Sequence, residues 1–193
     1  MLAGLNHVIK QLLIFKVHIV AFAWGLCEAT FFFIVPDVWL SLIAKNDLKL
    51  AFKAAIFSLI GALLGGYFMY FMGSNYLEAT LSFLKSIPAI NESLITQAQQ
   101  SIEKLGALAI VVGGFKGVPY KIFATISANG GIGFFVLSIA TIVARLLRFF
   151  AVILMVRFIT KLLLRLDYQG NLTKLILSVW IVFYCFYFWQ FSA

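Results

Sequence analysis

The chain has 193 residues, of which 63% are hydrophobic and 11% are charged, and its mean hydropathy is +1.04. Because soluble domains carry about 25% charged residues, this composition excludes a soluble globular protein and predicts one membrane domain over residues 1–193. The formal net charge of +8 is typical of a membrane protein with basic cytoplasmic loops, so we predict no nucleic-acid partner.

The first apolar segment, residues 17–36, is interrupted by acidic residues. Glu28 lies inside it, and Pro36 and Asp37 end it. Proline breaks helices, and irregular backbone at membrane depth needs protein or water around its polar groups. The segment therefore predicts a re-entrant helical hairpin, with a full crossing as the alternative.

The second apolar segment, residues 54–77, contains no charged residue and is long enough to cross a bilayer as a helix. Gly61, Gly65 and Gly66 lie on one face of this helix and would let another backbone approach closely. It is the clearest transmembrane helix of the sequence.

Residues 75–104 form the only long polar stretch. Apolar residues repeat at helical spacing before Pro88, and Asn91 is placed to cap a second helix. The predicted apolar face of this second helix consists of Leu94, Ala98, Ile102 and Leu105. We expect two amphipathic helices along the membrane surface, with binding of a partner protein as the alternative.

A second broken apolar segment covers residues 105–128. Gly117 and Pro119 interrupt it, together with two basic residues, Lys116 and Lys121. This pattern predicts a second re-entrant hairpin that faces the first. The distribution of lysine and arginine between the two sides of the membrane favours re-entry of both segments over two full crossings.

Two further crossings complete the predicted fold, at residues 132–156 and at about 175–191. The first of them places Arg145 near mid-membrane and Arg148 one turn later. The second ends in an interfacial aromatic belt made of Trp180, Tyr184, Tyr187 and Trp189. The predicted fold is thus an all-α, polytopic membrane bundle with about three full transmembrane helices and two facing re-entrant hairpins.

Six ionisable residues fall within these apolar segments. A charge at the centre of a membrane helix costs about 2.5–3.5 kcal/mol, so we expect these groups to be paired or hydrated in one polar groove. Two acids against four bases leave a surplus of about +2, which guanidinium groups and lysines would offer to a phosphate-bearing ligand. The alternative is a structural ion pair between Glu28 and Arg145 that only fixes helix packing. The six residues are Glu28, Asp37, Lys116, Lys121, Arg145 and Arg148.

The sequence predicts no metal site, no cofactor and no enzyme. Its two histidines are His7 and His18, and its two cysteines, Cys27 and Cys185, lie far apart in apolar segments. These numbers and spacings match no common zinc motif. No nucleophile with a neighbouring base is visible either.

Four motifs together resemble the DedA superfamily, also called SNARE-associated or VTT-domain membrane proteins, and most of all its YqaA-like branch. They are residues 28–38 (EATFFFIVPDV), the glycines at 61–66, residues 113–123 (GGFKGVPYKIF) and residues 145–150 (RLLRFF). The resemblance covers about residues 20–158, which would form the VTT-like core.

The resemblance implies a bundle with two facing re-entrant hairpins. Relatives are described as lipid scramblases or as transporters that recycle polyprenyl phosphate carriers, with links to the proton-motive force. By this resemblance Glu28 and Asp37 form a proton-carrying acidic pair. Lys116, Lys121, Arg145 and Arg148 would bind the headgroup, and Pro36, Gly117 and Pro119 would break the hairpins.

We therefore predict a multi-pass inner-membrane protein that moves the phosphate-bearing headgroup of a phospholipid or polyprenyl phosphate through a charged groove. Membrane lipids and protons would be its partners, and a homo-oligomer is compatible with the sequence. Two alternatives remain at this stage: a proton-coupled exporter of a small solute, and a membrane scaffold that transports nothing.

Overall fold

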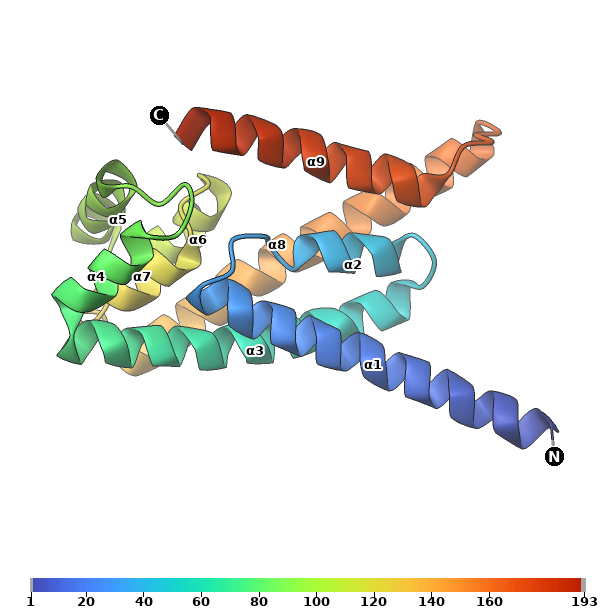
Figure 1. The fold of residues 1–193 in the computed structure, drawn as a ribbon, viewed down its shortest axis with the longest axis horizontal. Helices are drawn as coiled ribbons and strands as arrows, with labels where there is room; N and C mark the ends of the chain where they lie inside the picture. The colour runs from blue at the N-terminus through green and yellow to red at the C-terminus, as the bar shows by residue number, and fades with distance from the viewer. Residues whose placement is uncertain (1, 192–193) are drawn as a thin grey trace.

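The computed structural model describes the backbone of residues 2–191 and the side chains of residues 11–190. This part of the chain is all-helical and contains no strand. Figure 1 shows the long helices α1, α3, α8 and α9 extending along the molecule, with the short helices α4 to α7 gathered at one end. The helices are α1 (Leu2–Thr30), α2 (Asp37–Ala44), α3 (Leu48–Asn75), α4 (Leu77–Lys85), α5 (Glu92–Leu105), α6 (Leu108–Phe115), α7 (Tyr120–Ile126), α8 (Phe134–Arg165) and α9 (Leu172–Phe191).

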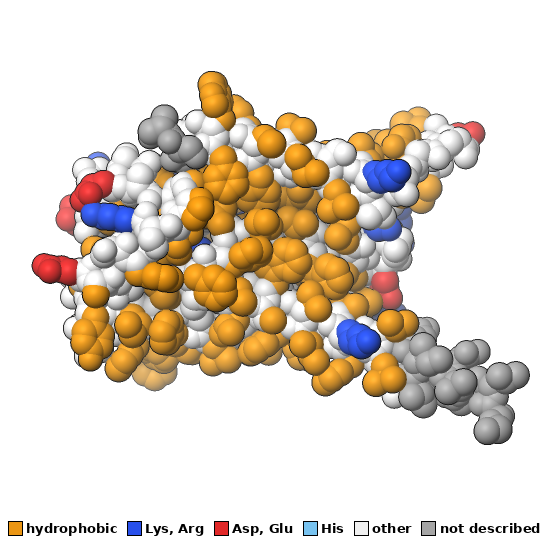
Figure 2. Space-filling view, viewed as in Figure 1, with side chains coloured by type: hydrophobic (Ala, Val, Ile, Leu, Met, Phe, Trp, Pro, Cys, Tyr) orange, Lys and Arg blue, Asp and Glu red, His pale blue; other side chains and the backbone are white. Residues whose placement is uncertain are grey.

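Four helices are long and apolar enough to cross a membrane. They are Gln11–Thr30 within α1, Leu48–Asn75, Phe134–Arg165 and Leu172–Gln190 within α9. Figure 2 shows apolar side chains over the middle of the molecule and charged side chains at its two ends. The all-α prediction is confirmed, four helices have the length and composition of membrane spans, and by length α1 joins the three helices expected to cross.

Glycines let α1 pack closely on α3. A Cβ on Gly61 would overlap the Phe22 carbonyl oxygen of α1, and a Cβ on Gly25 would overlap the Ser58 carbonyl oxygen of α3. The Ser58 hydroxyl also donates a 2.9 Å hydrogen bond to the Ala21 carbonyl oxygen. The close approach predicted for the glycine face of residues 54–77 is therefore confirmed.

The first broken segment turns back on itself. Helix α1 ends at Thr30, whose methyl lies against Gly65, well before the end of α3. Pro36 then precedes α2, which returns along α1, since the Trp39 indole N–H reaches the Val17 carbonyl oxygen at 3.4 Å. A break falls within this segment, as predicted, but the helix ends at Thr30, and Pro36 stands at the start of α2.

The second broken segment turns between α6 and α7. Gly117 has a φ of +80°, a left-handed conformation that suits glycine, and Pro119 precedes the first residue of α7. The Tyr120 hydroxyl then lies where a Cβ on Gly66 would be. The two turns therefore meet next to neighbouring glycines of α3.

Helices α4 and α5 cover the second turn. The Asn91 side chain accepts a 2.9 Å hydrogen bond from the Leu94 amide, which confirms the predicted cap. Leu94, Ala98 and Ile102 are buried in the same core as α6 and α7. Leu105 is 44% exposed, so its assignment to the buried face was wrong; the helix ends there because Gly106 takes a positive φ.

Candidate functional site

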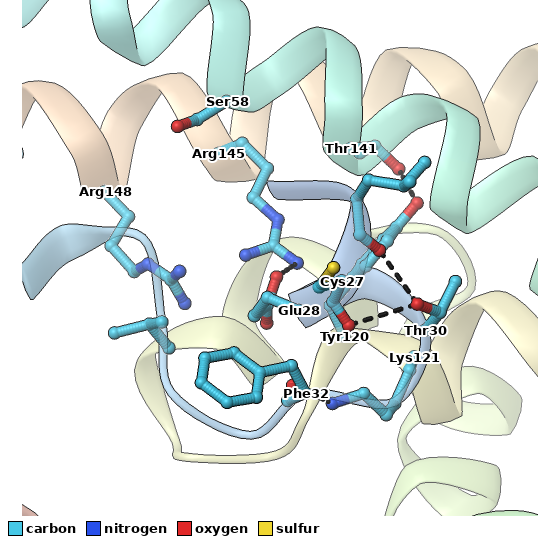
Figure 3. Close-up of polar contacts among 12 residues, drawn as sticks. Cys27, Glu28, Thr30, Phe32, Ser58, Tyr120, Lys121, Thr141, Arg145 and Arg148 are labelled. Carbon is cyan, nitrogen blue, oxygen red and sulfur yellow. Dashed lines mark hydrogen bonds and ion pairs between the residues drawn. The ribbon is translucent and has the colours of Figure 1, made fainter. Parts of the chain in front are cut away.

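The innermost charged contact joins the end of α1 to the middle of α8. Arg145 Nη2 lies 2.6 Å from Glu28 Oε2, and the two side chains are 3% and 5% exposed (Figure 3). Two residues 117 positions apart thus form one ion pair away from solvent. This contact corresponds to the structural pairing that the sequence left open as an alternative.

A second ion pair lies one helical turn further along α8. Arg148 Nη2 donates a 2.9 Å hydrogen bond to Asp37 Oδ2. Asp37 is the first residue of α2, directly after Pro36, so the break in the helix brings its carboxylate to α8. The Asp37 side chain is buried, but that of Arg148 is 20% exposed.

Lys121 connects the two turns. Its side chain comes from α7 and is buried, and its ammonium donates a 2.8 Å hydrogen bond to the Phe32 carbonyl oxygen (Figure 3). Phe32 lies in the irregular segment between α1 and α2, where its carbonyl is free of helical bonding. A lysine of the second turn is therefore hydrogen-bonded to the backbone of the first turn.

Tyr120 is a site residue that the sequence analysis missed. Its ring lies under the Arg145 guanidinium, with 4.6 Å from Arg145 Cζ to the ring centroid, a favourable cation–π distance. Its hydroxyl shares a 2.8 Å hydrogen bond with Thr141 of α8. The only hint in the sequence is its position between Pro119 and Lys121, because its partners lie on other helices.

Lys116 does not belong to the cluster. It is the residue after α6, and its side chain is exposed, while Lys121 on the other side of the turn is buried. The placement predicted for Lys116 was therefore wrong, because the turn separates the two lysines. With Glu28 and Asp37 against Lys121, Arg145 and Arg148, the surplus charge of the described cluster is +1 rather than +2.

The small residues before Glu28 face α3. Ala21 and Gly25 both pack on Ser58 of that helix. Glu28, one turn later, reaches α8 at Arg145. The small residues therefore set the depth at which α1 lies on α3, and with it the position of the carboxylate.

Several polar atoms of the cluster have no hydrogen-bond partner within the described chain. They include Arg145 Nη1, Arg148 Nε and Asp37 Oδ1. Leaving a buried polar atom unpaired costs about 1–3 kcal/mol. Their positions fit a site that is completed by water or by a ligand.

The residues that carry these atoms line a cavity of about 600 Å³. Along α8 the cluster forms its charged end, and the rest of its wall is mostly apolar and comes from α8, α9, α6 and the two turns. The charged residues that line it are Glu28, Asp37, Lys121, Arg145 and Arg148. Five of the six ionisable residues singled out in the sequence thus meet at one cavity.

Helix α9 attaches to both turns through its aromatic residues. The Val35 amide donates to the Tyr184 hydroxyl at 2.8 Å, and the Tyr187 hydroxyl donates to the Gly117 carbonyl oxygen at 2.7 Å. The Trp180 indole N–H reaches Ser41 Oγ at 3.3 Å. Their interpretation as an interfacial belt was therefore incomplete, since these three residues face the protein.

Among the described residues, no group of three or more His, Cys, Asp or Glu side chains lies close enough to hold a metal ion. The carboxylates at the site are instead held by arginines. The arrangement can bind an anion or exchange a proton on a carboxylate.

A protein of Haemophilus influenzae that carries the description "uncharacterized" is 33% identical to this chain over 129 residues. The match covers 65% of this chain, and the chain spans 64% of the length of that relative. No protein-family profile and no solved structure matches the sequence.

Proposed function

We propose that the protein moves the phosphate-bearing headgroup of a membrane lipid through the charged cavity, and that it belongs to the DedA superfamily that its motifs resemble. The observation that carries the proposal is that Arg145 and Arg148, whose guanidinium groups keep unpartnered donors, both line a cavity of about 600 Å³. Guanidinium groups bind phosphate oxygens through paired hydrogen bonds.

The lining of the cavity favours a lipid over a small solute. Only its inner end is charged, and most of the remaining wall is apolar. A small polar solute would leave this apolar wall without a matching surface, while a lipid presents both kinds of surface. A proton-coupled exporter of a small solute is therefore the second candidate function.

The proposal includes re-entry of both broken segments. Helices α2 and α6 have eight residues each and α7 has seven, so each is only about 10–12 Å long, against about 30 Å for the hydrocarbon core. The two turns lie next to Gly65 and Gly66, inside the length of α3. If the two segments enter the membrane from opposite sides and turn back inside it, their helices can be short and their turns can meet beside the middle of α3.

Proton coupling follows from the pairing of acids and arginines. While Asp37 is ionised, it accepts a hydrogen bond from Arg148. Protonation would remove the charge that holds the guanidinium and free it for a phosphate oxygen. The hypothesis is that a proton and a headgroup alternate at Arg148.

The charges at the two ends of the bundle support an orientation in the inner membrane. The start of α1, the α2–α3 junction, the end of α8 and the start of α9 lie at one end of the molecule (Figure 1). Cytoplasmic ends of membrane proteins are rich in lysine and arginine, so we place this end in the cytoplasm. Its bases include Lys16, Lys45, Lys49, Lys53, Arg157, Lys161, Arg165 and Lys174, against Lys85 and Lys104 at the other end.

The test uses a double variant that removes the inner pair as a unit. Glu28→Gln with Arg145→Met keeps the approximate volumes and removes both charges of the pair together, and Lys121 keeps its hydrogen bond to the Phe32 carbonyl oxygen, so the protein should fold. We expect headgroup translocation in proteoliposomes to fall to the rate of protein-free vesicles. The matched control is Lys85→Met with Glu92→Gln, which removes an exposed ion pair (2.8 Å).

The outcomes separate the candidate functions. Lipid translocation that is lost in the Glu28/Arg145 variant and kept in the Lys85/Glu92 control supports the proposal. Translocation at wild-type rate in both variants contradicts it. Flux of a solute along a pH gradient with no lipid movement selects the exporter, and neither activity in the wild type selects the scaffold.

A further inference from the structure

We propose further that an apolar chain of the bound lipid lies inside the protein, between α8 and α9, and does not stay wholly in the surrounding bilayer. This inference rests on the proposed function, because it takes the occupant of the charged end to be a lipid headgroup. It adds a second binding region, with its own residues, to the charged cluster.

The first observation is that α8 and α9 are neighbours in the chain but hardly touch. The connection between them is short, residues 166–171, yet α9 packs mainly on α2. Figure 1 shows the two helices diverging from their connection. Two apolar helices joined by a short loop would ordinarily pack against each other, so the space between them needs an occupant.

The second observation is that the cavity occupies this space. From α8 it is lined by Val152, Val156 and Ile159, and from α9 by Leu175, Ile176 and Val179. The distance along α8 from Arg148 to Ile159 is about 16 Å at 1.5 Å per residue. This is about half of the 30 Å hydrocarbon core, which is the depth of one leaflet.

The third observation is the order of the two regions along α8. The arginines with unpartnered donors lie at one end, and the apolar residues follow in the same cavity. An anionic head at Arg145 and Arg148 would direct an attached chain along the apolar wall. A free phosphate would use only the charged end and leave the rest of the wall unexplained.

The size of the cavity limits what it can hold. Pockets of about 300–1,000 Å³ enclose a drug-sized ligand, and this cavity measures about 600 Å³. It therefore has room for a headgroup and part of one chain. A second chain of the same lipid would remain in the bilayer.

The experiment places a photoreactive group at the end of the chain. The full-length protein is reconstituted in phosphatidylcholine vesicles that contain a trace of phosphatidic acid with a diazirine at the terminus of one acyl chain. After illumination, labelled peptides are identified by mass spectrometry. We expect labels on residues that line the cavity, namely Val152, Val156 and Ile159 of α8 and Leu175, Ile176 and Val179 of α9.

Matched variants test the location. Val156→Trp fills the space from α8 and Ile176→Trp fills it from α9, and each should lower this labelling about tenfold, the equivalent of about 1.4 kcal/mol of binding. Leu154→Trp is the control, because Leu154 lies on the same helix, is 52% exposed and does not line the cavity. Labelling in the control should equal that of the wild type.

Two results would overturn the inference. One is labelling spread evenly over lipid-facing positions such as Leu154, unchanged by either filling variant. The other is equal labelling of residues 152–159 by a diacylglycerol with the same diazirine chain, because the charged end would then have no part in placing the chain.

The outcome is independent of the translocation assay. Translocation in the wild type without labels between α8 and α9 would leave the proposed function standing and remove the chain site. Labels between α8 and α9 that the filling variants abolish, with no translocation in the wild type, would keep the chain site and remove the proposed function.

Discussion

Two ion pairs connect the same parts of the chain, and they differ in how much water reaches them. Glu28–Arg145 and Asp37–Arg148 both join the region of the first turn to α8, where the arginines are three residues apart. Arg145 is 3% exposed and rests on the Tyr120 ring, whereas Arg148 is 20% exposed. The inner pair is therefore a fixed, enclosed contact, and the outer pair is the one that water can reach.

The difference follows from what covers each arginine. Tyr120 reaches Arg145 because Gly66 of α3 leaves room for its hydroxyl, which is bonded to Thr141. Arg148 lies one turn further along, at the cavity wall. A buried pair is costly to form but also costly to break, because the partner that is left behind keeps an uncompensated charge.

The largest expected effect is on the inner pair. Glu28→Gln alone leaves Arg145 charged and unpaired in a buried position, so we expect a loss of about 3–5 kcal/mol in the free energy of unfolding. Adding Arg145→Met should restore most of it. Unfolding of the purified protein in detergent measures both values. Equal stability of the single and double variants would mean that Arg145 finds water or another partner, against the fixed contact described above.

The second effect concerns the support of the inner pair. Gly66→Ala would place a methyl group on the Tyr120 hydroxyl, so Tyr120 must move away from Arg145 at a cost of about 1–3 kcal/mol. Gly114→Ala is the control, because no atom lies within 4 Å of a Cβ at Gly114. The same unfolding measurement tests both variants. A Gly66 variant as stable as the Gly114 variant would show that Tyr120 is not held by α3.

The third effect separates stability from function at the outer pair. Arg148→Gln leaves Asp37 without its ion-pair partner, but the partial exposure of Arg148 lets water compensate, so we expect a loss of only about 1–2 kcal/mol. Headgroup translocation should nevertheless be lost, since the guanidinium is the proposed phosphate ligand. Arg148→Lys keeps the charge without the paired geometry and should retain part of the rate. Full activity of Arg148→Gln would assign the headgroup to Arg145 and Lys121.

The sequence was most informative where local chemistry decides the structure. Apolar length predicted three of the four long helices, glycine spacing predicted a close backbone approach on α3, and proline and glycine predicted the two breaks. Ionisable residues in apolar segments are costly unless they meet or are hydrated. The sequence named Glu28–Arg145 as a structural alternative, and the structure adds Asp37–Arg148.

The sequence could not predict contacts that depend on where side chains point in the folded protein. The cluster uses Tyr120 under Arg145 and the Phe32 carbonyl under Lys121, and neither partner carries a signal in its own neighbourhood of the chain. The attachment of Tyr184 to Val35 joins residues 149 positions apart. An aromatic residue at the end of a membrane helix suits the interface as well as a partner helix, so composition alone could not separate the two.

The smallest expected effect is at Lys116, and it sharpens the comparison between buried and exposed charges. Lys116 and Lys121 flank the same turn, but only Lys121 is buried and bonded to the first turn. Lys116→Met should change the free energy of unfolding by no more than about 0.5 kcal/mol and leave headgroup translocation at the wild-type rate. Lys121→Met removes the hydrogen bond to Phe32 and should lower both. If Lys116→Met slowed translocation as much as Lys121→Met, the headgroup would have to pass the exposed side of the turn, and the buried cluster could not be its whole path.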